Sequence, residues 1–244
     1  MGPGRGSLAG LRWLASVGPA PADAWGAAMG WAGSTTFSHA ARLIAAGLAA
    51  SGSMRRGHGS LFYATGRGVR ECGLVATPTR SAPAPSTWAH WSACAWTAAW
   101  LASRGREVLG QRELQCDPRW HEELEWIERD GLRRRGHHPD LAAALAPRGR
   151  WLPIEVELAV KSTNRLRSIL ALHARWIAAR KTDAVLYICA SQAGAERVLR
   201  HSQDVGLSVE ARTLRVETLS VIREAALTAR QREDRREATT VAAS

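Results

Sequence analysis

The sequence contains very little lysine and no paired cysteines. Lys161 and Lys181 are its only lysines, so arginine carries almost all of the net charge of +11. No two of the four cysteines have CxxC spacing. This absence excludes a zinc knuckle and argues against a disulfide framework. Reduced thiols are typical of the cytoplasm, where we expect the protein to be located.

Long hydrophobic runs are also absent. The most apolar stretch, Ala93 to Ala102, is far shorter than the roughly 18 residues that a membrane span requires. An apolar run near the N-terminus ends at Pro19 and is too short, and too broken by glycine and proline, for a signal peptide. The sequence therefore predicts a soluble protein without membrane association.

Several catalytic signatures are missing, which excludes the enzyme classes that depend on them. There is no nucleophile elbow, P-loop, GxGxxG or HExxH pattern. A chain of 244 residues with 45% hydrophobic content can form one large domain or two smaller ones with a real core. The basic balance favours a polyanionic partner, nucleic acid first and an anionic membrane second, although a GC-rich coding bias towards arginine is an alternative explanation.

The first 78 residues predict three helices followed by a hairpin. Apolar residues recur at helical spacing over residues 8–17, 21–29 and 34–48. Residues 51–65 predict a β-hairpin with a basic tip, and a last short helix follows over 66–74. In the third helix, Phe37, Ala41 and Ile44 form one apolar face, which we expect to be buried.

This order resembles a winged helix-turn-helix module, which lays its third helix in the major groove and contacts the backbone with its wing. Residues 1–85 contain eight arginines against two acids, Asp23 and Glu71, which agrees with a DNA-facing surface. The resemblance implies double-stranded DNA as the partner; a module for protein contacts, or a solvated arginine loop, is the alternative. The expected DNA-binding residues are Thr36, Ser38, His39, Arg42, Arg55, Arg56 and His58.

Residues 79–87 are rich in proline, serine and alanine and predict a linker. Residues 88–222 predict a second domain, and residues 223–244 a charged, partly disordered tail. The expected elements of the second domain are a tryptophan-rich helix (87–103), a strand (107–115), a helix (120–129), strands (133–145 and 151–160), a helix (162–180), a strand (184–190), a helix (193–204) and a strand (208–214).

Acidic residues stand in an apolar setting between His137 and Lys161. Residues two apart on a strand share a face, so Glu155 and Glu157 point together, and Asp140 on the neighbouring strand would join them. Burying unpaired carboxylates is costly, and binding a cation is one good reason for it. Carboxylates are ligands that Mg²⁺ prefers, and lysine can neutralise charge on a phosphoryl group. The pattern favours a site for Mg²⁺ or Mn²⁺ that acts on a phosphodiester.

A purely structural interpretation competes with this site. Asp140 would cap a turn after Pro139, and the two glutamates would pair with arginines on a half-exposed strand. His137 and His138 lack a third soft ligand nearby in the sequence, which disfavours a metal site formed by them. His173, on an apolar helix face, is interpreted as a core histidine.

The same residues resemble the PD-(D/E)xK nuclease superfamily. The match is Pro139-Asp140 and then Glu155, whereas Glu157 stands where the superfamily has lysine; Lys161 would replace that lysine from the following helix. The resemblance implies an α/β (α+β) restriction-endonuclease-like domain of αβββαβ order. It also implies Asp140, Glu155, Glu157 and Lys161 as catalytic residues and Asp140 and Glu155 as metal ligands, with Glu113 as an additional acidic ligand.

Over residues 34–215, a winged helix followed by His-x-Pro-Asp and Glu-Val-Glu-x-x-x-Lys resembles the replication-relaxation proteins of plasmids and bacterial mobile elements. The resemblance implies DNA processing or replication control. We therefore expect a DNA-binding protein that acts as a metal-dependent nickase or endonuclease. The alternatives are a non-catalytic replication accessory protein and a winged-helix transcriptional regulator. A monomer and a homodimer are both compatible with the sequence.

Overall fold

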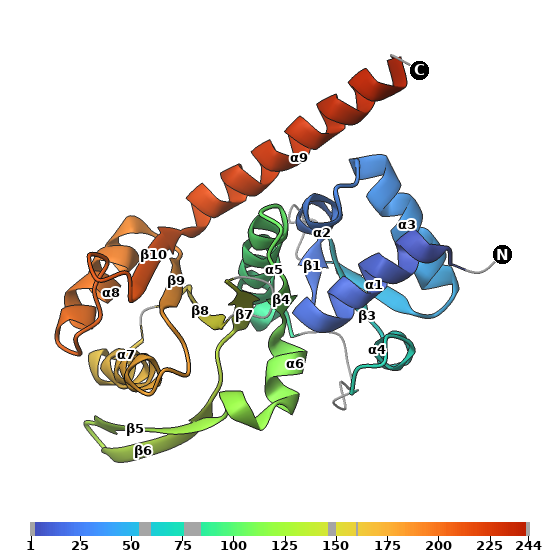
Figure 1. Ribbon diagram of the computed structural model, residues 1–244. Helices are drawn as coiled ribbons and strands as arrows, with labels where there is room; N and C mark the ends of the chain where they lie inside the picture. The colour runs from blue at the N-terminus through green and yellow to red at the C-terminus, as the bar shows by residue number, and fades with distance from the viewer. Residues whose placement is uncertain (1–2, 54–59, 76–83, 146–149, 160, 243–244) are drawn as a thin grey trace.

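The protein combines helices and strands in two adjoining parts (Figure 1). The structure, a computed structural model, describes residues 3–53, 60–75, 84–145, 150–159 and 161–242. No helix within these ranges has the length and apolar character needed to cross a membrane. The mixed α and β class predicted from the sequence is confirmed.

Helices and a small sheet form the first part, here called the N-terminal unit. Its elements are α1 (Arg5–Val17), β1 (Ala20–Pro21), α2 (Ala22–Met29), α3 (Gly33–Ala45), β2 (Ala49–Ser53), β3 (Ser60–Ala64) and α4 (Gly66–Glu71). Strands β2 and β3 pair antiparallel, and β1 adds to the other edge of β3. The three predicted helices, the paired strands and the short last helix all form in the expected order. The predicted basic tip, residues 55–59, lies outside the described residues.

The buried face of α3 differs from the predicted one. Thr36 and Ala40 are buried, whereas Phe37 and Ile44 are exposed at 57% and 40%. Both sets have helical spacing, so periodicity alone does not distinguish them. Close packing explains the observed choice, because a Cβ atom on Gly26 of α2 would lie 2.6 Å from Thr36 Oγ1.

The second part, here called the C-terminal unit, is built around a five-stranded sheet of order β10-β9-β8-β7-β4. Strands β8, β9 and β10 are parallel, while β7 and β4 run antiparallel to their neighbours. Among the described residues, strands β5 and β6 pair with each other alone and form a separate ribbon. The elements are α5 (Trp88–Ala102), β4 (Val108–Leu109), α6 (Gln111–Cys116), β5 (Glu122–Glu128), β6 (Gly131–His137), β7 (Leu141–Ala144), β8 (Trp151–Glu157), α7 (Thr163–Ala178), β9 (Val185–Cys189), α8 (Gln192–Gln203), β10 (Leu214–Thr218) and α9 (Leu219–Ala242).

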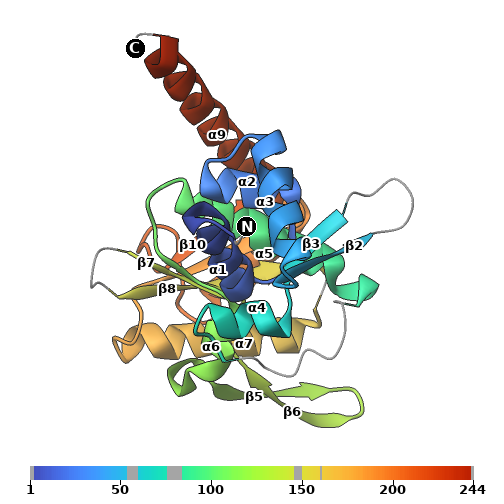
Figure 2. The same ribbon diagram turned by 90° about the vertical axis from the view of Figure 1, so that its right-hand side faces the viewer.

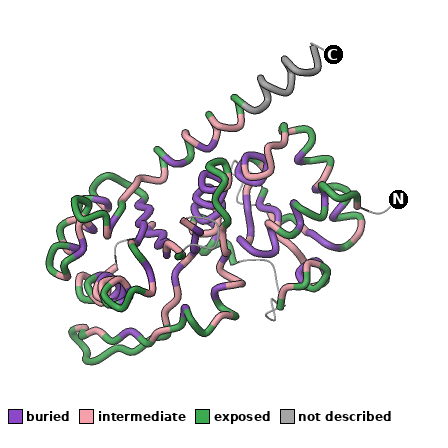
Figure 3. The backbone as a smooth tube through the Cα atoms, viewed as in Figure 1, coloured by how far each residue is buried: buried purple, intermediate pink, exposed green. Residues whose placement is uncertain are grey.

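Helices cover both faces of this sheet. Ile154 and Val156 of β8 join the core on the α5 side, whereas Tyr187 of β9 joins the core formed with α7 and α8. Buried residues concentrate in α5 and the central strands, and the β5–β6 ribbon is largely exposed (Figure 3). Figure 2 shows that this ribbon lies beside α7, apart from β7 and β8. Because strand side chains alternate between faces, Glu155 and Glu157 lie on the face opposite to Ile154 and Val156.

The two parts share one hydrophobic core. Leu11 and Trp25 of the N-terminal unit belong to the same buried cluster as Trp96 of α5 and Ile222 of α9. Gly18 marks the contact between the units. Its φ is 110°, and a Cβ atom there would lie 2.4 Å from the Trp91 ring, so only glycine fits. The two predicted domains therefore pack together through this shared cluster, and the C-terminal unit has a second core between its sheet, α7 and α8.

One predicted strand is mostly a helix. In the range 107–115, only Val108 and Leu109 form a strand, and α6 follows at once. Gly110 packs directly on the N-terminal unit, because a Cβ atom there would lie 2.0 Å from the Ser16 carbonyl oxygen. Contact between the units, which the local pattern does not contain, sets the conformation here.

One predicted helix is a strand. Residues 120–129 were expected to be helical, but β5 occupies Glu122–Glu128. Leu124 and Trp126 point towards α7 at the two-residue spacing of a strand. Asp130-Gly131, with Gly131 at φ 121°, closes the hairpin to β6. Positive φ favours glycine at this position, and the pairing of β5 with β6 outweighs the helical spacing of the glutamates.

Three further predicted elements have different boundaries in the structure. The predicted strand over 133–145 is divided into β6 and β7 on either side of Pro139, and the predicted strand over 208–214 is replaced by β10. The predicted tail is helical through Ala242, as part of α9. Ile222 and Ala226 anchor this helix to the shared core.

Candidate functional site

A pocket of about 640 Å³ lies beside the end of β8 and brings the predicted catalytic residues together. Asp140, Glu155, Glu157 and Lys161 all line it. The remaining polar lining residues are Ser86, His90, Gln111, Arg135, His137, His138 and Arg165. Acids and bases are therefore mixed on its walls, with contributions from α5, the ribbon, β8 and the start of α7.

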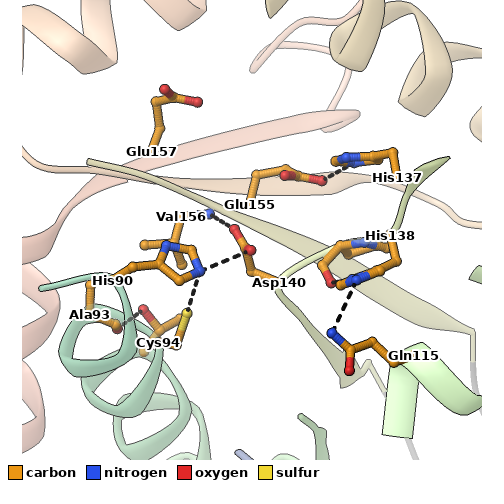
Figure 4. A network of polar contacts seen from close by, with 12 residues as sticks. His90, Ala93, Cys94, Gln115, His137, His138, Asp140, Glu155, Val156 and Glu157 are labelled. Carbon is orange, nitrogen blue, oxygen red and sulfur yellow. Dashed lines mark hydrogen bonds and ion pairs between the residues drawn. The ribbon is translucent and has the colours of Figure 1, made fainter. Parts of the chain in front are cut away.

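Asp140 connects the sheet to α5. Its backbone N–H donates to the Ile154 carbonyl at 3.0 Å, and its Oδ2 accepts the Val156 N–H at 2.7 Å. Its Oδ1 lies 3.2 Å from His90 Nε2 (Figure 4). The side chain thus supplies an acceptor for the backbone of β8 just beyond the paired residues Leu141 and Ile154.

Glu155 is buried and accepts from two imidazoles. His137 Nε2 and His173 Nε2 each lie 2.9 Å from the same atom, Glu155 Oε1. Burial alone would raise the pKa of Glu155, but the two histidines hold that pKa well below its ordinary value. Burial lowers the pKa of His173, whereas for His137 the attraction of Glu155 outweighs burial and raises it. The proton that balances Glu155 therefore resides more readily on His137.

Glu157 forms an ion pair with Lys161. Burial, the largest effect, raises the pKa of Glu157 above its ordinary value in spite of the nearby lysine. In Figure 4, Glu157 points away from Asp140 and Glu155. The two glutamates share a face of β8, as predicted, but each carboxylate has its own partner.

The three carboxylates do not form one ligand group. Within the described residues, one group of three potential metal ligands is found: His137, Glu155 and His173. Their donor atoms lie within 4.8 Å of one another. Mg²⁺ takes oxygen ligands in a near-octahedral arrangement. A set of two imidazole nitrogens and one carboxylate oxygen does not fit Mg²⁺ and is typical of transition metals.

Glu113 has a different role from the expected one. It lies on α6 and not on the pocket wall. Its carboxylate accepts from Ser16 Oγ of α1 and, at 3.1 Å, from the Gly110 N–H. The expected metal-ligand role is not supported by this position, since the side chain joins the N-terminal and C-terminal units.

The expected DNA-binding residues differ in accessibility. Thr36 is buried and donates to the Ala32 carbonyl, so it cannot contact DNA in this conformation, and its prediction as a contact residue is wrong. His39 stacks on Trp31 with ring centroids 4.0 Å apart and is only partly exposed. Ser38 and Arg42 are exposed on α3. The other three predicted residues, Arg55, Arg56 and His58, lie outside the described residues.

A basic strand borders the pocket, and the sequence pattern assigned no role to its arginines. Arg133, Arg134 and Arg135 are consecutive on β6 and all exposed. Arg134 pairs with Glu125 across the ribbon, while Arg135 reaches the pocket wall. The run of arginines is visible in the sequence. Its position beside the pocket is known only once the fold places the β5–β6 ribbon there.

Three histidines have roles that the sequence does not predict. The sequence pattern assigns no role to His90, interprets His173 as a core residue and disfavours His137 as a metal ligand for want of a third ligand. The structure places Glu155 and His173 beside His137. His173 is fully buried, as expected of a core residue, but it is bound to an acid. These contacts of His137 and His173 with Glu155 become visible only when the fold brings β6 and α7 next to β8.

Comparisons with known proteins add no relative to these observations. No protein-family model, curated protein or solved structure matches the sequence.

Proposed function

We propose that this protein binds double-stranded DNA through its N-terminal unit, as a winged helix-turn-helix. The order of three helices followed by the paired strands β2 and β3 supports this assignment. Ser38 and Arg42 project from α3 into solvent, where a hydroxyl and a guanidinium can contact bases or phosphates. The net charge of +11 supports a polyanionic partner.

The C-terminal unit is a restriction-endonuclease-like domain in this proposal. In support, α5, β4, β7, β8, α7 and β9 follow one another in αβββαβ order, with α6 and the ribbon inserted. The first three of these strands form an antiparallel meander, and β9 joins β8 in parallel. Together with the HHPD and EVELAVK segments, this order supports a relationship to replication-relaxation proteins of plasmids and mobile elements.

The observation that carries the proposal is that Asp140, Glu155, Glu157 and Lys161 all line the same pocket. The pocket is where a DNA phosphodiester would be nicked or cut. Lys161 would stabilise negative charge on the phosphoryl group. Arg135 would bind neighbouring phosphates and so position the DNA backbone in the pocket. Catalysis would also require a divalent ion, and the donors that lie together are those of a transition metal.

A non-catalytic DNA-binding accessory protein is the second candidate, and one observation favours it. Each carboxylate already has a protein partner: Asp140 has His90 and the Val156 N–H, Glu155 has two histidines, and Glu157 has Lys161. A nuclease scaffold whose acids are committed to internal pairs would bind DNA without cutting it.

Plasmid conversion separates the two candidates. Supercoiled plasmid is incubated with the protein and Mg²⁺, Mn²⁺ or Zn²⁺, and nicked and linear products are measured on a gel. We expect conversion by the wild type and at least about a 100-fold slower rate for Asp140→Ala, the size of effect typical of losing a preorganised charged group. Asp183→Ala is the matched control, because this exposed carboxylate pairs with Arg150 outside the pocket.

DNA affinity is measured on the same three proteins by fluorescence anisotropy. Binding without conversion in any of them would establish the second candidate in place of the nickase. Equal conversion rates in the wild type and Asp140→Ala would remove the pocket as the catalytic site. An absence of duplex binding by the wild type would overturn the proposal as a whole.

A further inference from the structure

Three polar side chains meet beneath β8, on the side that α7 covers. Glu155 occupies the middle of β8, His137 is the last residue of β6, and His173 lies on the inward face of α7. These elements are distant in the sequence and are brought together only by the fold. Such a convergence of imidazoles and a carboxylate in the protein interior requires an explanation, because each polar group loses its hydration there.

The spacing of the donor atoms suits coordination of a metal ion. Both Nε2 atoms lie 2.9 Å from Glu155 Oε1, and all three donor atoms lie within 4.8 Å of one another. Ligand atoms bound to one metal at bond lengths near 2.1 Å are about 3.0 to 3.4 Å apart, for octahedral and tetrahedral geometry respectively. Both nitrogen–oxygen separations of 2.9 Å are close to these values, so a metal ion could replace the shared protons.

The surroundings indicate a site that opens on one side. His173 and Glu155 are almost fully buried, at 0% and 4% exposure, while His137 is 12% exposed and lines the pocket. The rings of Trp176 and Tyr187 flank His173 at centroid distances of 5.3 Å and 6.2 Å. Three protein ligands with access from a pocket leave a coordination position for water or a substrate oxygen.

A second observation concerns Tyr187, which sits directly opposite Glu155 in the pairing of β8 with β9. Its side chain is 1% exposed, and its hydroxyl has no hydrogen-bond partner in the described part of the chain. Buried hydroxyls are normally satisfied, so a missing partner on this face of the sheet is unusual. A water molecule held by a bound metal is one group that can satisfy such a hydroxyl.

We propose that His137, Glu155 and His173 bind a divalent transition metal ion, such as Zn²⁺, Co²⁺ or Mn²⁺, whose open coordination position faces the pocket. This site is distinct from the all-oxygen Mg²⁺ site that the sequence predicts, since only Glu155 is common to both. The inference does not depend on DNA cleavage, because metal binding can be measured without DNA.

Cobalt binding tests the site directly. Protein freed of metal with a chelator is titrated with Co²⁺, and its visible absorption bands report coordination by nitrogen and oxygen; Zn²⁺ is then added in competition. The Cys116→Ser background removes the exposed thiol as an alternative ligand. We expect one equivalent to bind, with affinity reduced by more than about 100-fold in both His137→Gln and His173→Gln, because loss of a direct ligand exceeds the 10–100-fold effect of its supporting groups.

His121→Gln is the matched control. His121 is exposed and lies near His138, with ring centroids 6.2 Å apart, so it represents the competing histidine pair near the pocket. Unchanged binding in His121→Gln is expected. His137→Gln, at the pocket rim, keeps the test decisive if the buried His173 variant fails to fold.

Three results would overturn the inference: no stoichiometric Co²⁺ or Zn²⁺ binding by the wild type, loss of binding in His121→Gln instead, or displacement of Co²⁺ by a modest excess of Mg²⁺. The last result would restore the oxygen-ligand site. Failure of plasmid cleavage, in contrast, would leave the metal titration unaffected, so the two proposals fail independently.

Discussion

His90 Nε2 and Asp140 Oδ1 lie 3.2 Å apart and join α5 to the entrance of β7. The hydrogen bond to Asp140 raises the pKa of His90 above its ordinary value of 6.5, against the lowering effect of burial. The pocket therefore contains an imidazole that remains protonated to higher pH than a free histidine. Its charge is available to a phosphate over a correspondingly wider range.

We expect this contact to stabilise the fold in a pH-dependent manner. Since the folded-state pKa of His90 exceeds the unfolded value, the stabilisation is complete below about pH 6.5 and is lost as the pH rises through the folded-state pKa. Asp140→Asn should lower the pKa of His90, as followed by NMR of its ring protons. An unchanged His90 titration in this variant would contradict the assigned contact.

DNA contact through α3 predicts different effects for two of its side chains. Arg42→Ala should weaken duplex binding and reduce the slope of log affinity against log salt by about 1, because one phosphate contact is lost. Thr36→Val should leave this slope unchanged, since Thr36 is buried against α2. Anisotropy titrations at several salt concentrations measure both. Equal slopes in wild type and Arg42→Ala would exclude Arg42 as a phosphate contact.

Replacing Gly110 should destabilise the protein, because the structure has no room for a Cβ atom at this position. Gly110→Ala would place a methyl group 2.0 Å from the Ser16 carbonyl oxygen, and we expect a loss of about 1–3 kcal/mol of unfolding free energy from the forced shift. Gly136→Ala is the control, because a Cβ atom there would have no atom of the described residues within 4 Å. Urea denaturation measures both, and a similar stability of the two variants would contradict close packing of α6 on α1.

Thiol reactivity provides a test of the core around β9 and α5. Cys116 is exposed, whereas Cys94 and Cys189 are buried; Cys72 is partly exposed and is replaced by serine throughout. Burial also raises the pKa of the Cys189 thiol to about 12. At pH 8, a disulfide reagent such as Ellman's should react rapidly with Cys116, while Cys94 and Cys189 should react only after unfolding. Cys116→Ser should remove the rapid phase. A rapid phase that persists in this variant would show that α5 or β9 opens and exposes Cys94 or Cys189.

The sequence predicts those elements whose pattern is complete within a few residues. The alternation of Ile154, Glu155 and Val156 identifies β8 and the face that its acids occupy. The apolar run of β9 and the spacing of Leu166 and Leu170 in α7 are equally local. For this reason the placement of Glu155 and Glu157 on one face follows from sequence alone. The position of Asp140 does not, because a single strand over 133–145 was expected and the structure places Asp140 in the break before β7.

Long-range packing decides what the sequence does not predict. The glutamates of β5 suit a helix until its pairing with β6 and its contact with α7 are known. Thr36 and Phe37 exchange their expected environments because α2 lies close to α3. His137 and His173 are each 18 residues from Glu155 along the chain, and no periodic pattern relates residues at that separation.

The attachment of α9 has a consequence for how the protein is made. Ile222 and Ala226 complete the cluster that contains Leu11 and Trp25, so the core of the N-terminal unit includes side chains that leave the ribosome about 200 residues later. Segments synthesised first must therefore wait, with apolar surface uncovered, until α9 is available. The chain is expected to fold largely after synthesis and to depend on chaperones during it, because such transiently exposed surface promotes aggregation.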